Sequence, residues 1–385
     1  MSCKAASIVP GPSRPITDEQ RLAWLRLIRT DGIGPITHRE LVNQFGGAIE
    51  AIAALPDLAR RGGRKRPLPV YPDHKAAREI DDARRLQAFL VAPGDEGYPP
   101  WLWHAHGAPP MLFVKGQREI AAKPIVGIVG ARNASVAGQK IARLIAAHLG
   151  EAGLVVGSGL ARGIDAAAHK AALSTGTIAA LAGGIDVVYP PEHQALQASI
   201  GEIGLLMTEQ PPGYVPRAQD FPRRNRLIAG MAAGIVIVEA ARRSGSLITA
   251  RLATEIGREV MAVPGNPLDP RAEGTNGLLR QGATLVRGGE DVVEAIRPII
   301  GLGEMEGVAK ESLPELPAVP ERAAMEHVTT DARETIIASL GPAPADIDEI
   351  VRATQIHIGL VRIVLLELDL AGRLERHPGA LVSLR

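Results

Sequence analysis

The chain has 385 residues, which at roughly 100–200 residues per domain predicts two or three domains. Its 46% hydrophobic and 22% charged residues are ordinary for a folded protein with a real core. The 43 lysines and arginines are almost balanced by 42 acidic residues, so the net charge of +1 excludes a polycation that coats nucleic acid. Because aromatic residues make up only 3%, base-stacking surfaces are also scarce. Any nucleic-acid site must therefore be a local patch.

The chain contains one cysteine, Cys3, which excludes an internal disulfide and a cysteine-based metal cluster. Its first residues, MSCKAASIVPGPSRP, lack the apolar core of a signal peptide. No apolar run approaches the roughly 18 residues that a membrane-spanning helix needs. We therefore expect a cytoplasmic protein without membrane insertion.

The N-terminal part is predicted to be a helical module (17–95) behind a disordered tail (1–16) that carries three prolines. Within this module, residues 60–66 have the sequence Arg-Arg-Gly-Gly-Arg-Lys-Arg. They predict a loop, because paired glycines break helices. Such a run is more often a solvated basic loop than a phosphate contact, which stays the alternative.

Short apolar runs recur through the middle of the chain, with helix-like stretches such as residues 139–149 between them. Apolar strands that alternate with amphipathic helices are typical of a parallel sheet covered on both faces. The sequence therefore predicts a doubly wound α/β domain over residues 96–300. Its expected strands are 125–129, 154–156, 178–181, 205–207, 235–238, 260–263 and 284–286.

The C-terminal part divides into a linker and a small domain. Residues 301–324 contain five glutamates and three prolines and are predicted to be an acidic, Pro-rich linker. Residues 325–385 resume helical periodicity, with Ile358, Val361, Leu365 and Leu368 on one face, and end in a strand-like segment. Helices followed by a short strand pair predict a winged-helix domain.

The first strand of the α/β domain runs into Gly127-Ile-Val-Gly130-Ala-Arg132-Asn133-Ala-Ser135, and a helix is expected from about Val136. A strand, a glycine turn and a helix N-terminus make an anion site, because unpaired backbone N–H groups and the helix dipole face the ligand. The guanidinium group of Arg132 could add two charged hydrogen bonds to a phosphate. The segment fits neither the dinucleotide fingerprint nor the P-loop pattern, and a plain tight turn stays the alternative.

The next strand is followed by Gly157-Ser158-Gly159-Leu-Ala-Arg162-Gly163-Ile-Asp165, again with glycines, a hydroxyl group and an arginine. Ligands of open parallel sheets bind at the carboxyl ends of the strands, so we expect the two loops to converge there. Asp165 is predicted to cap the following helix rather than to act in catalysis.

Two further segments carry charged or hydroxyl side chains. Phe221-Pro-Arg223-Arg224-Asn225-Arg226 is predicted to be a loop leading into a helix, with surface guanidinium groups facing the same edge as the glycine loops. Ser244-Gly-Ser246 begins another expected helix and is a weaker candidate. His169 and His193 have no metal-ligand partner at helical spacing and are expected to be structural. The pattern indicates a site that holds phosphates, without catalytic residues or a metal.

In this order, GIVGARNAS, GSGLARGIDAAAH, GGIDVVYP, FPRRNRLIAG, EAARRSGSLITA, and VPGNP with EGTNGLLRQGA resemble the DNA-processing protein A (DprA/Smf) family over residues 108–296. The resemblance implies an extended Rossmann-like domain that binds single-stranded DNA and loads the RecA recombinase during natural transformation. It also implies a homodimer, no catalytic activity and no cofactor. The residues that it assigns to DNA phosphates are Gly130, Arg132, Asn133, Ser158, Gly159, Arg162, Gly163, Arg223, Arg224, Asn225, Arg226, Ser244 and Ser246.

The flanking domains resemble the family less closely. Asp31-Gly-Ile-Gly-Pro35 looks like the hairpin of a helix-hairpin-helix or SAM-like module, although a helix cap at Gly32 explains it equally well. The end of the chain resembles the winged-helix module of some members. Six arginines against nine acidic residues give residues 325–385 a net charge of −3, so long-range attraction to DNA would be poor. We expect a protein contact or a spacer role for it.

An enzyme is the alternative function. A nucleotide-phosphoribohydrolase of the lysine-decarboxylase-like group has a related core, but it carries a Pro-Gly-Gly-x-Gly-Thr-x-x-Glu signature that this chain lacks. The nearest glycine pair, Gly183-Gly184, is followed by Ile-Asp. A dinucleotide-dependent oxidoreductase is disfavoured because the fingerprint is missing.

Overall fold

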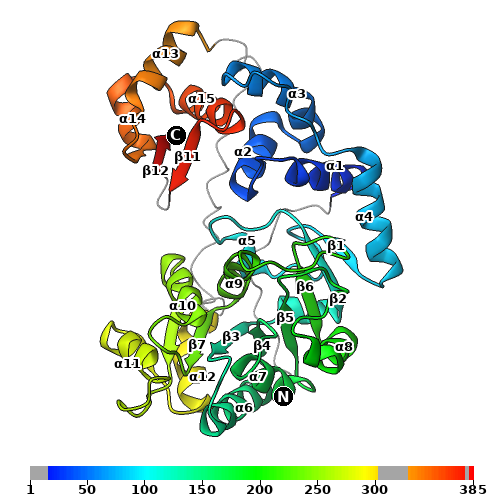
Figure 1. The fold of residues 1–385 in the computed structure, drawn as a ribbon, viewed down its shortest axis with the longest axis vertical. Helices are drawn as coiled ribbons and strands as arrows, with labels where there is room; N and C mark the ends of the chain where they lie inside the picture. The colour runs from blue at the N-terminus through cyan, green and yellow to red at the C-terminus, as the bar shows by residue number, and fades with distance from the viewer. Residues whose placement is uncertain (1–15, 302–327, 378–380) are drawn as a thin grey trace. The chain divides into compact units, whose positions relative to one another are not determined.

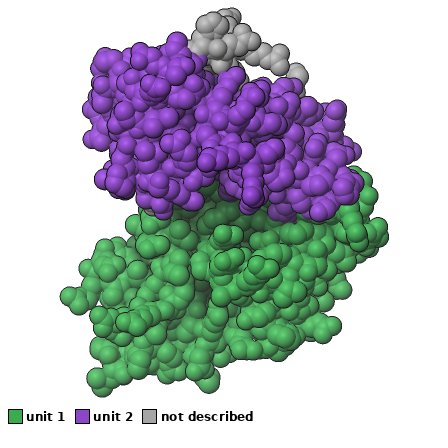
Figure 2. Space-filling view, turned by 45° about the horizontal axis from the view of Figure 1, so that its top comes forward, with its two compact units in different colours: residues 1–15, 78–308 green, residues 16–77, 309–385 purple. Residues whose placement is uncertain are grey.

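The computed structural model describes residues 16–301, 328–377 and 381–385 (Figure 1). Most of the predicted tail and of the predicted linker lies outside these residues. The chain divides into two compact units, one of residues 1–15 and 78–308 and the other of residues 16–77 and 309–385 (Figure 2). The second unit therefore combines residues 16–77, near the start of the chain, with residues 309–385 at its end. None of the described helices is long and apolar enough to cross a membrane.

The first unit is built on a nine-stranded sheet with the order β1-β2-β6-β5-β4-β3-β7-β8-β9. Neighbours from β6 to β9 in this order are parallel, whereas β1 and β2 add an antiparallel edge. Each strand predicted between residues 125 and 286 is present. The strands are β1 (Phe89–Val91), β2 (Leu112–Gly116), β3 (Ile125–Gly130), β4 (Val155–Ser158), β5 (Thr177–Ala180), β6 (Leu205–Thr208), β7 (Gly234–Val238), β8 (Glu259–Ala262) and β9 (Thr284–Leu285).

Strand β1 corrects the prediction of a helical segment up to residue 95. Its three residues pair with β2 in the register Phe89↔Val114 to Val91↔Leu112. A run of three apolar residues is too short for periodicity to distinguish a strand from the end of a helix. The pairing partner, which lies more than twenty residues further along the chain, decides the structure here.

Helices cover both faces of the sheet, which explains why its strands are apolar on both sides. On one face, α6, α7 and α12 pack against Val126 and Ile128. On the other face, α5, α9 and α10 pack against Ile125 and Val129. The helical elements of this unit are α5 (Pro100–Trp103), η1 (Arg118–Ala122), α6 (Val136–Glu151), α7 (Ile164–Ala172), η2 (Pro191–His193), α8 (Gln194–Ile203), α9 (Asp220–Met231), α10 (Gly245–Glu255), α11 (Glu273–Arg280) and α12 (Gly289–Ile300).

Strand β3 lies at the point where the winding of the sheet reverses. It pairs with β4 on one side and with β7 on the other, so the loops after β3 and β7 lead away in opposite directions. Gly130 and Val238, which end these strands, are register partners. A crevice at the carboxyl ends of two such strands is where open α/β sheets bind ligands.

The second unit contains the helical module and the winged-helix module. The hairpin at residues 31–35 joins α1 to α2, with Gly32 in the left-handed region at φ +81°. The predicted winged-helix module is present, and its described residues form three helices and a sheet of order β10-β12-β11, one strand more than the predicted pair. The elements are α1 (Asp18–Arg29), α2 (Pro35–Phe45), α3 (Ala48–Arg61), α4 (Asp73–Arg85, which reaches into the first unit), α13 (Thr330–Ser339), β10 (Ala345–Asp346), α14 (Ile347–Thr354), α15 (Ile358–Leu370), β11 (Leu374–His377) and β12 (Leu381–Leu384).

Candidate single-strand-binding site

A cavity of about 870 Å³ lies at the carboxyl ends of β3 and β7. It is lined mainly by the loop after β3, the first turns of α9 and the loop that leads from β7 into α10, with further residues that include Ala161, Asp165, Tyr189 and Arg271. Three segments that are far apart in the sequence therefore meet, as expected for loops at a reversal point. Seven of the predicted site residues line it: Gly130, Arg132, Asn133, Arg224, Asn225, Ser244 and Ser246.

The other predicted residues do not line this cavity: Ser158, Gly159, Arg162, Gly163, Arg223 and Arg226. Ser158 is buried, and its hydroxyl donates to the carbonyl oxygen of Ile128 at 2.6 Å. Arg162 is exposed and pairs with Glu192, whereas Arg226 donates to Gly107 and Glu209. Their contact with a phosphate stays a prediction, and Ser158 would have to give up an internal hydrogen bond to make one.

The glycines of the two predicted phosphate loops serve the packing of the chain on itself. A Cβ atom at Gly130 would overlap the carbonyl oxygen of Val238, so glycine is needed for β3 and β7 to approach. Gly163 has φ +73° and lies against the carbonyl oxygen of Ala131 in the first loop. A Cβ at Gly159 would overlap the guanidinium group of Arg224. These glycines bring the two loops and α9 together, and a contact between their backbone and a phosphate stays a prediction.

Arg224 is the buried centre of this packing, which corrects the expectation of a surface arginine in a loop. It lies in α9, is 6% exposed, and donates to the carbonyl oxygens of Gly159 and Ala180. Burial lowers its pKa to about 10, so the guanidinium group is still protonated at neutral pH. The whole Phe221–Arg226 segment is helical because α9 already begins at Asp220.

Asp165 is the buried counter-charge, and its predicted role as a helix cap is wrong. Its carboxylate accepts the backbone N–H groups of Gly159 and Ala161, both at 3.2 Å, which belong to the loop before α7. Burial raises the pKa of Asp165, while the charge of Arg224 lowers it. Arg224 and Asp165 together hold the Gly157–Asp165 loop, one through a carbonyl oxygen and the other through amide groups.

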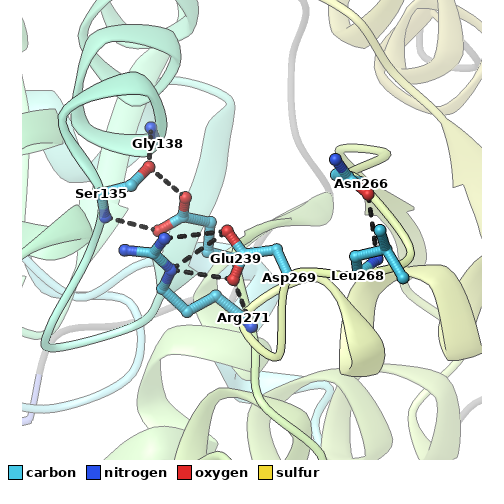
Figure 3. A network of polar contacts seen from close by, with 7 residues as sticks. All are labelled: Ser135, Gly138, Glu239, Asn266, Leu268, Asp269 and Arg271. Carbon is cyan, nitrogen blue, oxygen red and sulfur yellow. Dashed lines mark hydrogen bonds and ion pairs between the residues drawn. The ribbon is translucent and has the colours of Figure 1, made fainter.

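The N-terminus of α6, predicted to be an anion site, is already occupied by a carboxylate of the chain. Glu239 follows β7 and accepts the backbone N–H of Ser135 at 2.8 Å and also its hydroxyl group (Figure 3). The Ser135 hydroxyl in turn accepts the N–H of Gly138. Figure 3 also shows Arg271, which is paired with Asp269 and whose pKa Glu239 helps to raise. An external phosphate would have to displace Glu239 from this helix end.

The N-terminus of α10 is the open helix end in the cavity. Ser244 caps it by accepting the N–H of Ser246. A Cβ at Gly245 would meet nothing within 4 Å, and its φ lies outside the left-handed region, so no contact within the chain demands glycine there. The neighbouring Arg132 and Arg243 are exposed, and neither forms an ion pair with a carboxylate in the described part of the chain. This end of the cavity therefore combines backbone donors with two available cations.

Two aromatic residues in the same cavity were missed as site residues from the sequence. The rings of Tyr189 and Phe221 lie 5.2 Å apart, and the guanidinium group of Arg132 sits 5.4 Å from the centre of the Phe221 ring. Tyr189 is 48% exposed. Both residues belong to motifs that drew attention for other reasons, VVYP and FPRRNR. The scarcity of aromatic residues in the chain is the signal that could have singled them out, whereas their contact with each other and with Arg132 is visible only in the structure.

The two histidines of the domain have structural contacts, as expected. His169 is buried, its Nδ1 lies 2.7 Å from the Thr177 hydroxyl, and burial lowers its pKa to about 3, which keeps it neutral. The Nδ1 atom of His193 lies 3.0 Å from the carbonyl oxygen of Leu160. Among the described residues, no group of three or more histidine, cysteine or acidic side chains is arranged to hold a metal ion.

The model of the family DNA recombination-mediator protein A matches residues 89–297, which is more than half of the chain. The chain belongs to this family. The flanking modules match as well: a DprA-like N-terminal helix-hairpin-helix domain over residues 18–82 and a DprA winged-helix domain over residues 319–380. The family assignment made from the sequence motifs is thus confirmed.

Among curated proteins of the family, the DNA processing protein DprA of Streptococcus pneumoniae is 39% identical over 266 residues, which cover 67% of this chain and 93% of that protein. The Smf protein of Escherichia coli is 37% identical over 302 residues and 77% of each chain. The solved structure of the S. pneumoniae protein has a TM-score of 0.60 and 35% identity, with 73% of this chain and 98% of that one covered.

A second solved structure, of DNA processing protein A from Helicobacter pylori, has a TM-score of 0.51 and 26% identity. It covers 55% of this chain and 96% of its own, and it gives insight into the single-stranded DNA binding mode of the H. pylori protein.

Proposed function

We propose that this protein binds single-stranded DNA, independently of sequence, in the cavity at the carboxyl ends of β3 and β7. The observation that carries the proposal is the pairing of two available arginines and an open helix N-terminus with an aromatic pair in one cavity. Phosphates suit the first group and exposed bases suit the second. The single-strand binding described for the H. pylori relative supports the same ligand.

A single strand suits this cavity better than a duplex does. The bases of a duplex are stacked on each other, so only an unpaired strand can place a base on Tyr189 and Phe221. The contacts at Arg132 and Arg243 would go to the backbone, which carries no sequence information. Sequence-independent binding follows from both features.

We further propose that the protein acts in the cytoplasm as a homodimer and loads RecA onto incoming single strands during natural transformation. The family's description as a recombination mediator supports this role. Within the same proposal the protein is not an enzyme. Incubation with nucleoside monophosphates separates it from a nucleotide-phosphoribohydrolase: we expect no release of free base, and release would favour the enzyme.

Salt should weaken binding in a characteristic way. If each site neutralises roughly 3–5 phosphates, the logarithm of the binding constant should fall against the logarithm of salt concentration with a slope of about −2 to −4. Titrations of labelled single strands and duplex of equal length at several salt concentrations measure this. A flat salt response, or tighter binding of the duplex, would contradict the proposed site.

Replacing Phe221 by leucine should weaken the binding of single strands while leaving the salt slope unchanged. Stacking of a base on an aromatic ring is worth about 1–3 kcal/mol, so the affinity should fall roughly 5- to 100-fold. The phosphate contacts remain, which is why the slope stays the same. The same titrations report both quantities, and a change of slope with unchanged affinity would show that Phe221 does not stack on a base.

A further inference from the structure

Helix α15 of the winged-helix module is buried on two opposite faces. Val361 and Leu368 pack in the core of the winged helix itself. Leu366 and Leu370 belong instead to the core of the helical module, in a cluster with Leu41 and other residues of α1 to α3. A helix with apolar residues on two opposite faces is typical of one that packs against a partner on each of them.

Charged and polar groups reinforce this contact. Arg376 bonds to both carboxylate oxygens of Glu40 at 3.1 and 2.6 Å and to Asp369 at 3.0 Å. The Asp369 carboxylate also accepts the hydroxyl of Thr37 at 2.8 Å. The bonds from Arg376 to Glu40 and from Thr37 to Asp369 join residues more than 330 positions apart in the sequence. The contact between the helical module and the winged helix is therefore both apolar and polar.

The basic loop at residues 60–66 is fitted to the same helix, and it is therefore not solvated throughout. Arg64 donates to the carbonyl oxygen of Leu370 at 3.2 Å, close to the C-terminus of α15, where a cation is favoured by the helix dipole. Arg373 donates to the carbonyl oxygen of Gly62 at 3.2 Å. The other arginines of residues 60–66 are exposed: Arg60 and Arg61, which end α3, and Arg66.

Gly62 gives independent evidence that the helical module is shaped for α15. Its φ of −69° is open to any residue, so its backbone conformation does not demand glycine. A Cβ atom at this position would overlap the backbone carbonyl oxygen of Glu367 in α15. The absence of a side chain at residue 62 allows the two backbones to approach.

In a helix-turn-helix, the second helix is the one that enters the groove of DNA, and here that helix is α15. We propose that α15 is instead the docking surface for the helical module of the same chain, so that this module and not DNA is its partner. The net charge of −3 over residues 325–385 fits the assignment, since an acidic module gains nothing from approaching a polyanion. The inference does not depend on the cavity proposed above, because it rests on contacts within the second unit.

A covalent lock tests the proposal in the full-length protein. In a Cys3→Ser background, Thr37→Cys and Asp369→Cys place two thiols where two side chains now bond, and a short bismaleimide can join them. We expect a bridge within one chain, and binding of single-stranded and duplex DNA within about twofold of the same variant capped with N-ethylmaleimide. A tenfold loss of binding on locking would overturn the proposal, because α15 would then need to leave the helical module. Bridging between two copies, or no bridging, would also overturn it.

Hydrogen exchange gives a second readout that does not involve DNA. Gly62→Ala should push α15 away and raise the amide exchange rates of residues 35–45 and 358–370 by about tenfold or more. Gly341→Ala in the winged helix is the matched control, because its Cβ would come no closer than 3.9 Å to another atom and should leave these rates unchanged. Equal rates in both variants would overturn the proposal. If Gly62→Ala does not fold, the covalent lock still decides.

Discussion

Replacing Arg132 by glutamate is expected to weaken the binding of single-stranded DNA by about 10- to 100-fold. A charged hydrogen bond contributes about 1.5–3 kcal/mol, and each 1.4 kcal/mol is a factor of ten in affinity. The substitution removes an available cation from the cavity and puts a repulsive carboxylate beside the open N-terminus of α10. The fold should be retained, because Arg132 is exposed and its guanidinium group lies over the face of Phe221.

The control for this prediction is Arg61→Glu, at the C-terminal end of α3 in the helical module. Arg61 is exposed and lies outside the cavity, so its reversal should change the affinity by much less. The salt slope adds a second criterion, because losing one phosphate contact should make it shallower by about 0.7. If Arg61→Glu binds poorly while Arg132→Glu binds normally, the DNA path runs over the helical module and the proposed site is wrong.

The sheet and the place of the site could be predicted from the sequence. Apolar runs such as residues 125–129 and 235–238, alternating with helical stretches, allow only a sheet that is buried on both faces. The rule that ligands bind at the carboxyl ends of such strands predicts a site at that end, and the cavity lies there. Local sequence patterns can predict the strands and the burial of the sheet because both depend on the residues of short segments.

The sequence could not show which of the candidate site residues hold the fold together and which are open to a ligand. A glycine in a loop can mark a position that excludes a Cβ, but the sequence does not show whether a ligand or another part of the chain excludes it. At Gly159 the guanidinium group of Arg224, which lies 65 positions further along the chain, excludes a Cβ. Likewise, Ser135 looks like the start of an open helix until Glu239, 104 positions away, is seen to occupy it. Such contacts between distant residues are properties of the tertiary structure.

The sequence of α15 contains a second apolar face, which indicates a second packing partner and which the helical periodicity of the first face does not explain. Four apolar residues on one face were enough to predict the helix, and the remaining ones, including Leu366 and Leu370, were left without a partner. A second apolar face on a short helix indicates a second packing surface. Which element covers it is again decided by residues about 300 positions away.

Replacing Arg224 by methionine is expected to destabilise the first unit by about 3–5 kcal/mol. The buried carbonyl oxygens of Gly159 and Ala180 would lose their donor, and the buried carboxylate of Asp165 would lose the charge that attracts it. Methionine fills much of the space without replacing either effect. Urea unfolding followed by circular dichroism measures the change, and a loss below about 1 kcal/mol would show that the buried guanidinium group contributes little.

Two further variants distinguish the loss of the buried contacts of Arg224 from the loss of a positive charge alone. Arg223→Met removes a neighbouring arginine of the same helix that is exposed, so it should change the free energy of unfolding by no more than about 0.5 kcal/mol. Asp165→Asn, added to Arg224→Met, keeps an oxygen that accepts the N–H groups of Gly159 and Ala161 but removes the unbalanced buried charge. The double variant should therefore be more stable than Arg224→Met alone. If the second substitution instead adds its own full cost, Arg224 and Asp165 act independently, and the loop is held by hydrogen bonds without any help from the attraction between their charges.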